Sequence, residues 1–401
     1  MQVPPFSFDK QLSAIGSELE SAVLRVLHSG QYVGGQEIQA FEDSFAEYVG
    51  VKNVVGCNSG TDALILALRA LEIGPGDEVI TSSFSFFATA EAISNVGAKP
   101  VFVDIQNNGY LIDIDSIEKA ITSKTKAILP VHLFGCPLDM ERIIELAKKY
   151  DLKVIEDCAQ SAGAKWKNKS VGSWGDAGCF SFFPTKNLGA AGDGGVVTTN
   201  NDQIAKQIRE LAVHGMPKRY FHTNLGYNSR LDALQAAILN VKLPMLAEWV
   251  NKRKQIAFRY EQSLRGLPGL KIPKLSNQLE MTHGWNQFVI KVTDCLSDGS
   301  SSKQEFQFGM ESSLEAFPDQ SPRDLLKKEL ELLGINTIIY YPIPIHLQPA
   351  YRQLGYTIGS LPITEEACSQ VLSLPIFPEL TLEQQEHVIK SIEKVLVTFK
   401  I

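Results

Sequence analysis

The chain has 401 residues, 44% of them hydrophobic, which is enough to bury a large core. This length is typical of two domains, and one large domain is the alternative. A net charge of −7 argues against a nucleic-acid-binding protein, and no apolar run reaches the roughly 20 residues of a membrane-spanning helix. None of the six cysteines forms a Cys-x-x-Cys pair, so a metal site is disfavoured and reduced thiols in a cytoplasmic protein are expected.

Between residues 52 and 215, apolar strand-like segments alternate with helical segments. The candidate strands are Asn53–Cys57, Glu78–Thr81, Pro100–Asp104, Lys126–Leu133, Lys153–Glu156, Cys179–Phe183 and Gly195–Thr199. A helix is predicted over Asp139–Tyr150, where apolar residues recur at helical spacing. This alternation predicts an α/β fold in which a mainly parallel seven-stranded sheet lies between helices.

The second half of the chain predicts a smaller domain. From Leu231 to Leu264 we expect one or two long helices with a kink at Pro244. The expected elements after them are strands over Asn286–Val292 and Asn336–Tyr341 and helices near Ile363–Val371 and Leu382–Val397. We therefore predict a large domain over residues 1–250, which includes an N-terminal arm, and a small α/β domain over 251–401. A polar surface loop is expected as an insertion near 298–322.

Ser59, Gly60 and Thr61 join the first strand to the helix after it. The start of a helix offers backbone N–H groups and a positive dipole end, which suit a phosphate. Gly60 allows close approach to the backbone, and Thr61 adds a hydroxyl donor. The same residues also suit an ordinary helix cap, so both interpretations remain open. Ser181 is a candidate for a further phosphate contact.

Three phenylalanines follow the second strand, at positions 84, 86 and 87. One of them could stack on a flat heterocycle, although packing in the core is the more common role of a phenylalanine.

Asp157 follows a short buried strand, at the position where open α/β sheets place their ligand-binding groups. A carboxylate there suits the pyridine nitrogen of pyridoxal phosphate (PLP), because a protonated ring is the better electron sink. The alternative is an aspartate that caps a helix or belongs to a loop.

Lys186 lies between the apolar strand that ends near Phe183 and a glycine-rich run from Gly189 to Gly195. A partly desolvated lysine loses its proton easily and can condense with an aldehyde, so Lys186 is the candidate Schiff-base residue of a PLP enzyme. The alternative is a lysine in a surface turn.

These segments, taken together and in order, resemble the DegT/DnrJ/EryC1/StrS family of sugar-nucleotide aminotransferases, which are fold-type-I PLP enzymes. The matching segments include Gly30–Gly35, Ser59–Leu64, Gly74–Ile80, Glu156–Gln160, Ser181–Gly189, Gly192–Gly195, Asn228–Asp232, Tyr341–Leu347 and Leu372–Ile376. The resemblance implies a small domain that closes over the cofactor, and it covers nearly the whole chain.

The resemblance also implies a role for each matched cofactor residue. Lys186 would hold PLP covalently, Asp157 would pair with its pyridine nitrogen, and Gln160 would bond its ring hydroxyl. Gly60, Thr61 and Ser181 would hold the phosphate, and Phe86 would stack on the ring. Asn228 would reach the phosphate bound by a neighbouring subunit, so the resemblance implies a homodimer with shared active sites.

Some family members carry histidine at the lysine position and act as dehydratases, so Lys186 favours amine transfer. The segments around Val213–Gly215 and Asn228–Asp232 resemble the subgroup that aminates carbon 3 of a keto sugar. In that subgroup the substrate pocket would be lined by Gly30, Tyr32, Thr185, Arg230, Tyr340 and Tyr341. Position 340 departs from the family pattern, which usually has histidine before the tyrosine that matches Tyr341.

The resemblance therefore implies a PLP-dependent aminotransferase that moves an amino group from an amino acid, by family likeness glutamate, to a nucleotide-linked keto sugar. Amino-sugar and surface-polysaccharide biosynthesis is the expected setting, with no nucleic-acid or membrane partner. The alternatives are a carbon-4 sugar or cyclitol aminotransferase and a non-catalytic regulatory protein with a PLP fold. A dinucleotide dehydrogenase is the weakest alternative, because no Gly-x-Gly-x-x-Gly follows the first strand.

Overall fold

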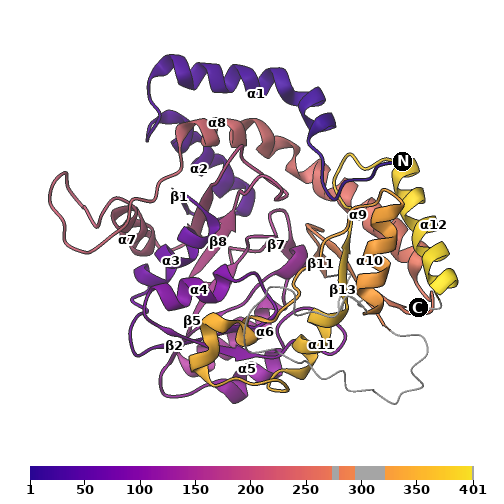
Figure 1. Cartoon of the computed structure of the whole chain (residues 1–401). Helices are drawn as coiled ribbons and strands as arrows, with labels where there is room; N and C mark the ends of the chain where they lie inside the picture. Colours follow the sequence, from indigo (N-terminus) through magenta and orange to yellow (C-terminus); the bar gives the residue numbers. More distant parts are fainter. Residues whose placement is uncertain (273–279, 294–320, 400–401) are drawn as a thin grey trace.

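A computed structural model describes residues 1–272, 280–293 and 321–399 of the chain (Figure 1). The polar insertion predicted near 298–322 lies outside the described residues except for its last two. Of these, Ser321 caps helix α10 (Pro322–Leu332) and Pro322 is its first residue. Within these ranges no helix combines the length and the apolar character that crossing a membrane requires.

The central sheet has seven strands in the order β1-β9-β8-β5-β4-β2-β3. Their bounds are β1 (Asn53–Cys57), β2 (Glu78–Ser82), β3 (Lys99–Val103), β4 (Thr125–Leu129), β5 (Lys153–Asp157), β8 (Ala177–Ser181) and β9 (Gly195–Thr199). Strand β9 is antiparallel to both of its neighbours, whereas β2, β3, β4, β5 and β8 pair in parallel. The predicted mainly parallel seven-stranded sheet is confirmed.

Helices cover both faces of this sheet. Successive side chains of a strand point to opposite faces, so a strand with apolar residues at successive positions packs against helices on both sides. In β1, Val55 and Cys57 join the core beneath α3 and α7, whereas Val54 packs with Phe41 and Phe45 of α2 on the other face. The helices of this part are α2 (Gln36–Val49), α3 (Gly60–Ala70), α4 (Ala88–Asn95), α5 (Ile114–Ala120), α6 (Met140–Tyr150) and α7 (Asp202–Ala212). The helix predicted from Asp139 is α6, and Asp139 caps it by accepting a hydrogen bond from Arg142 N.

A kinked helical segment connects the two parts of the chain in Figure 1. Helix α8 (Ala233–Lys242) passes through a 3₁₀ turn (Leu243–Met245) into α9 (Leu246–Leu264). The turn contains Pro244, as predicted, because proline cannot donate the next helical hydrogen bond. Helix α1 (Asp9–Ser29) lies along α8 and packs Ala22 and Val26 against Ala233 and Ala237.

The C-terminal part contains a second sheet, in the order β10-β12-β13, whose strands pair antiparallel. Its strands are β10 (Leu270–Lys271), β12 (Phe288–Val292) and β13 (Val371–Leu374), and its helices are α10, α11 (Pro362–Gln370) and α12 (Leu382–Phe399). A third, small sheet joins β11 (Met281–Thr282), β6 (Lys165–Trp166) and β7 (Lys169–Ser170).

The predicted strand over Asn336–Tyr341 is wrong. In this segment Ile338 makes a single bridge to Ser373. The β-branched residues of the segment favour a strand locally. However, the chain leaves the sheet at once, because Tyr341 bonds Gln160 and Ile345 bonds Ser83 of the first part.

Two hydrophobic cores share α9. Leu246 and Val250 pack with the large part, whereas Ile256 and Tyr260 pack in the C-terminal core. That core also contains Val3 from the N-terminal arm. The domain division at residue 250 stays a prediction.

Candidate cofactor and active site

The candidate site lies where β5 and β8 end. The two strands pair in parallel, and Asp157, the last residue of β5, is in register with Cys179 of β8. Lys186 follows β8, and its backbone N–H donates to the carbonyl of Phe183 at 2.8 Å. Because parallel strands end at the same edge, Asp157 and Lys186 lie near each other, close enough for the carboxylate to act on the Lys186 amine.

The Lys186 side chain is half-buried, and the surrounding protein changes its acidity. Burial lowers the pKa of Lys186 to about 8, while the nearby Asp157 carboxylate acts in the opposite direction. A lysine with this pKa is partly neutral near physiological pH, so its amine is available as a nucleophile or a base.

Asp157 is buried, and two groups hold its carboxylate. Thr89 donates from its hydroxyl to Oδ2 at 2.8 Å, and the N–H of Ala159 donates to Oδ1 at 3.1 Å. Burial raises the pKa of Asp157, against the opposing effects of Ala159, Thr89 and Lys186. Sequence reasoning missed Thr89, which lies on α4 in the same segment as Phe86, and no local motif marked it.

Gly60 and Ser181 meet directly, although they are distant in the sequence. A Cβ atom added to Gly60 would lie 2.6 Å from Ser181 Cβ, so only glycine fits. Ser59 caps α3 through a hydrogen bond from Asp62 N. The N–H groups of Gly60 and Thr61 have no hydrogen-bond partner within the described ranges. This helix start beside a serine can bind an anion.

The side chains of Gln160, Tyr341 and Phe86 form another wall of the candidate site. The Gln160 side chain accepts from Phe134 N at 2.7 Å and donates to the Tyr341 hydroxyl at 2.9 Å. Burial raises the pKa of Tyr341. The Phe86 ring lies 6.1 Å from the Tyr341 ring, yet its side chain is 59% exposed, so its face is open to a ligand. Tyr340 packs edge-on against Tyr341.

Among the remaining predicted site residues, Tyr32, Asn228 and Arg230 bond groups other than Lys186 in the described chain. Arg230 donates to the Asn228 side chain at 2.6 Å, and both are exposed. Gly30 ends α1, and the Tyr32 hydroxyl donates to Leu27 O at 3.2 Å. Val33 bridges to Asp232, which brings these two exposed segments together. Thr185, next to Lys186, is half-buried.

His132, Glu156 and Cys158 lie close enough together to suggest a metal site, but their hydrogen bonds assign them a structural role. Glu156 accepts from the N–H groups of Gly172, Trp174 and Gly175 and contacts His132 Nε2 at 3.0 Å. His132 Nδ1 accepts from Leu138 N, so both ring nitrogens are already engaged.

The residues at the two strand ends fit the cofactor that the sequence predicts. The α3 start and Ser181 offer N–H and hydroxyl donors for a phosphate, and the Gly60 position has no room for a side chain. Lys186 offers a partly neutral amine, and Asp157 offers a buried carboxylate. An exposed aromatic face at Phe86 completes a site for a flat, phosphorylated aldehyde.

Comparisons with known proteins agree with this chemistry. The family model described as the DegT/DnrJ/EryC1/StrS aminotransferase family matches residues 13–307 and 298–393. The chain is 43% identical to the UDP-N-acetyl-3-dehydro-alpha-D-glucosamine 3-aminotransferase of Acidithiobacillus ferrooxidans, over 98% of both chains. It is also 42% identical to a protein of Geobacillus stearothermophilus named a pleiotropic regulatory protein, again over 98% of both chains.

Among solved structures, DesV of S. venezuelae, crystallised in complex with a ketimine intermediate, superposes with a TM-score of 0.88. Its sequence is 38% identical to this chain, and the match covers 98% of both chains. The fold-type-I architecture expected from the resemblance is thereby confirmed. The chain belongs to the DegT/DnrJ/EryC1/StrS aminotransferase family and is a PLP-dependent aminotransferase.

Proposed function

We propose that this protein transfers an amino group from an amino acid, glutamate by family likeness, to carbon 3 of a nucleotide-linked keto sugar. The partly neutral amine of Lys186 beside the buried Asp157 carboxylate carries the proposal of amine transfer. The preference for carbon 3 is supported by the relative named as a 3-aminotransferase, which is 43% identical over nearly the full length.

The chain's own residues divide the work of such a reaction. Bound PLP supplies an electron sink that holds the amino group between the two halves of the reaction. Lys186 Nζ would remove a proton from the α-carbon of the amino donor and later deliver one to the carbon being aminated. A positioned base of this kind contributes roughly 10²–10⁴-fold to the rate. Asp157, fixed by Thr89, would keep a compensating negative charge at the base of the pocket.

A half-reaction screen tests the proposal. The enzyme carrying the aminated cofactor is mixed with 3-keto and 4-keto sugar nucleotides, and recovery of the aldehyde absorbance is followed. We expect recovery with a 3-keto substrate. Recovery with a 4-keto substrate alone would favour the carbon-4 alternative. The Lys186→Ala variant serves as the control, because it keeps the other pocket residues but lacks the amine that moves the proton.

We also infer a homodimer whose subunits complete each other's sites. Large apolar side chains are exposed on α1, on the turn before Lys186, and on the segment between α7 and α8, namely Leu12, Leu24, Leu27, Phe183, Tyr220, Phe221 and Leu225. Figure 1 shows the last of these segments extending beyond the rest of the chain. Arg230 and Asn228 lie just after it, exposed and bonded to each other, which supports a role in a neighbouring site.

The anionic substrate proposed here must be recognised by local positive charge, because the chain carries a net charge of −7. Lys218, Arg219 and Arg230 supply such charge on the exposed segment before α8. We also propose a cytoplasmic location, which is consistent with cysteines that are all unpaired and buried in the described ranges.

The regulatory alternative has one observation in its favour, the name of the relative from Geobacillus stearothermophilus. A regulatory protein with this fold has no need of a proton-transfer lysine, whereas this chain retains Lys186 with a lowered pKa. The addition of glutamate to the yellow holoenzyme distinguishes the two: an aminotransferase loses the colour, and a protein that only binds the cofactor keeps it.

A further inference from the structure

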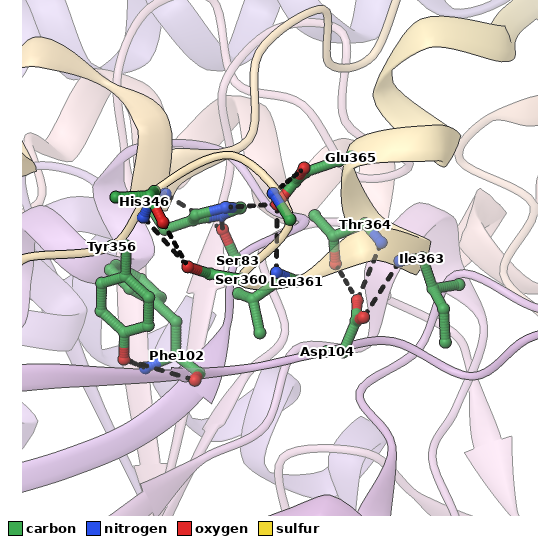
Figure 2. Close-up of polar contacts among 12 residues, drawn as sticks. Ser83, Phe102, Asp104, His346, Tyr356, Ser360, Leu361, Ile363, Thr364 and Glu365 are labelled. Atoms are coloured by element: carbon green, nitrogen blue, oxygen red, sulfur yellow. Dashed lines mark hydrogen bonds and ion pairs between the residues drawn. The ribbon is translucent and has the colours of Figure 1, made fainter. Parts of the chain in front are cut away.

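His346 lies in a buried polar cluster that joins two distant parts of the chain (Figure 2). Its Nδ1 is 2.7 Å from the Ser83 hydroxyl, and its Nε2 is 3.1 Å from Glu365 Oε1. All three residues are buried, Ser83 and His346 almost completely. The motif Tyr341–Leu347 matched the family in the sequence, yet the proposed reaction assigns no role to its histidine.

The hydrogen bonds define the state of the imidazole ring. Ser83 Oγ accepts from the backbone N–H of His346 at 3.0 Å, so its own hydrogen is free to point at Nδ1. Nε2 then carries the ring hydrogen and donates it to Glu365. Burial also lowers the pKa of His346, which favours this neutral form.

A serine, a histidine and a glutamate in contact also occur in hydrolases, but this cluster cannot act as one. The Ser83 side chain is fully buried, and its oxygen already bonds both the backbone and the ring of His346. A catalytic serine needs an exposed oxygen within reach of a substrate. The cluster therefore holds the chain in place.

Glu365 and Asp104 accept hydrogen bonds from the segment that follows His346. Glu365 also accepts from Gly359 N at 2.7 Å and from Leu361 N at 3.0 Å. Asp104, which follows β3, accepts from Ile363 N and Thr364 N at the start of α11. In Figure 2, Asp104 connects the start of α11 to the large sheet, whereas Glu365 connects α11 to His346 and to the loop before the helix.

The two segments that meet at Ser83 and His346 each carry one wall of the cofactor pocket. Phe86 lies shortly after Ser83, and the same segment includes Ser85, which contacts the Thr89 hydroxyl that supports Asp157. Tyr341 lies shortly before His346 and bonds Gln160. A backbone hydrogen bond from Ile345 N to Ser83 O at 3.0 Å also joins the two segments.

We propose that His346 is a positioning residue for the cofactor pocket: bound to Ser83 and Glu365, it fixes Phe86 and Tyr341 relative to Lys186. It touches neither cofactor nor substrate. A pocket works only when the groups that face the ligand are held by a packed second layer, and a displacement of about 1 Å is enough to matter. The inference rests on the cofactor assignment and is independent of which sugar is aminated.

The test compares variants that keep one half of the connection. His346→Asn places an amide oxygen near the former Nδ1 and keeps the contact to Ser83. His346→Gln reaches Glu365 instead, and His346→Ala loses both contacts. Each apoenzyme is titrated with PLP to obtain the dissociation constant, and the visible circular dichroism of the bound cofactor reports the geometry around its ring.

We expect His346→Ala to raise the PLP dissociation constant roughly 5- to 30-fold, as the loss of one or two buried hydrogen bonds implies. The circular dichroism should change with it. His346→Asn should recover most of both properties, because it retains the contact to the segment that carries Phe86. Ser83→Ala is a smaller change and should reproduce the effect. It replaces His346→Ala in the test if that variant does not fold.

Tyr356→Phe is the matched control. The Tyr356 hydroxyl accepts from Phe102 N at 3.0 Å, so it ties the same segment to β3 at a point away from the pocket. Its loss should lower the melting temperature and leave cofactor binding unchanged. The proposal is overturned if the His346 and Ser83 variants lose thermal stability but keep wild-type affinity and circular dichroism, or if Tyr356→Phe changes these readouts equally.

Discussion

At the scale of single residues, the Lys186 amine limits how fast the cofactor can be captured. Only a neutral amine attacks an aldehyde, and burial lowers the pKa of Lys186 to about 8. Below this value the capture rate of the apoenzyme should rise about tenfold per pH unit, and above it the rate should level off. Stopped-flow absorbance between pH 6.5 and 9.5 measures this profile. A rate still rising steeply above pH 9 would mean an unperturbed lysine.

The lowered pKa of Lys186 also predicts a pH dependence of the free energy of unfolding, which provides an independent check on that pKa. Folding lowers the pKa of Lys186, so between pH 8 and about 10.4 the unfolded chain binds more protons than the folded chain. The free energy of unfolding of the apoenzyme should therefore gain a contribution from Lys186 as the pH rises through this window. Lys186→Met should lack that contribution, which denaturation in urea at several pH values measures.

Gly60 allows a second prediction at this scale. In Gly60→Ala, the new methyl group would lie 2.6 Å from Ser181 Cβ and push the α3 start away from the end of β8. Because a phosphate would lose N–H donors, we expect PLP affinity to fall by about tenfold or more. The double variant Gly60→Ala/Ser181→Gly removes the 2.6 Å clash, leaving a 3.2 Å contact to the Cα of residue 181, and should bind PLP nearly as well as Ser181→Gly does. A double variant as weak as Gly60→Ala alone would contradict the steric explanation.

At the scale of elements, local patterns were sufficient for most of the fold. The strand β1, the helix α6 and the break at Pro244 each follow from apolar periodicity or from a proline within a short window. The segment 336–341 carries an equally good strand pattern, but contacts to Gln160 and Ser83 draw it out of the sheet. A local sequence pattern contains no information about such long-range contacts.

The same distinction applies to the site. Lys186, Asp157 and Gly60 could be predicted as site residues from the sequence because each follows a strand in a recognisable setting. Thr89 and His346 were not found, since their partners Asp157 and Ser83 lie far away in the sequence. Nothing in the residues next to a threonine or a histidine reveals which distant group it will meet in the folded chain.

The end of β5 provides a prediction about elements. Glu156 is fully buried and accepts three backbone N–H groups from residues 172–175 as well as contacting His132. In Glu156→Gln, an N–H₂ group replaces an acceptor and leaves buried donors unpaired. The free energy of unfolding should fall by about 3 kcal/mol. Urea denaturation measures this loss.

Asp176→Asn is the comparison for that variant. Asp176 accepts one backbone hydrogen bond, from Val154 N at 2.9 Å, and is partly exposed. Its replacement should cost only about 1 kcal/mol. Equal losses in the two variants would mean that the buried cluster around Glu156 adds no more than an ordinary surface bond.

At the scale of the whole molecule, the described chain assembles the cofactor side of the pocket, whereas Asn228 and Arg230 are exposed and bond each other. Apolar side chains around the same region, such as Tyr220 and Phe221, remain exposed. In a two-fold symmetric dimer, a surface that one subunit presents is also presented by the other. An exposed segment can thus complete the partner's site, and each subunit receives the same contribution in return.

Mixing two inactive variants tests this arrangement. Lys186→Ala removes the amine, and Asn228→Ala removes the proposed contribution to the partner's site. When the two are unfolded and refolded together, random pairing makes about half of the dimers hybrids. Each hybrid has one site with an intact Lys186 and an intact Asn228 from the other subunit, so about a quarter of wild-type activity should return. If Asn228 served its own subunit, no site in a hybrid would be complete and no activity would return. As a control, wild type refolded with the double variant Lys186→Ala/Asn228→Ala should lose activity beyond simple dilution, because the wild-type site of each hybrid then lacks the partner's asparagine.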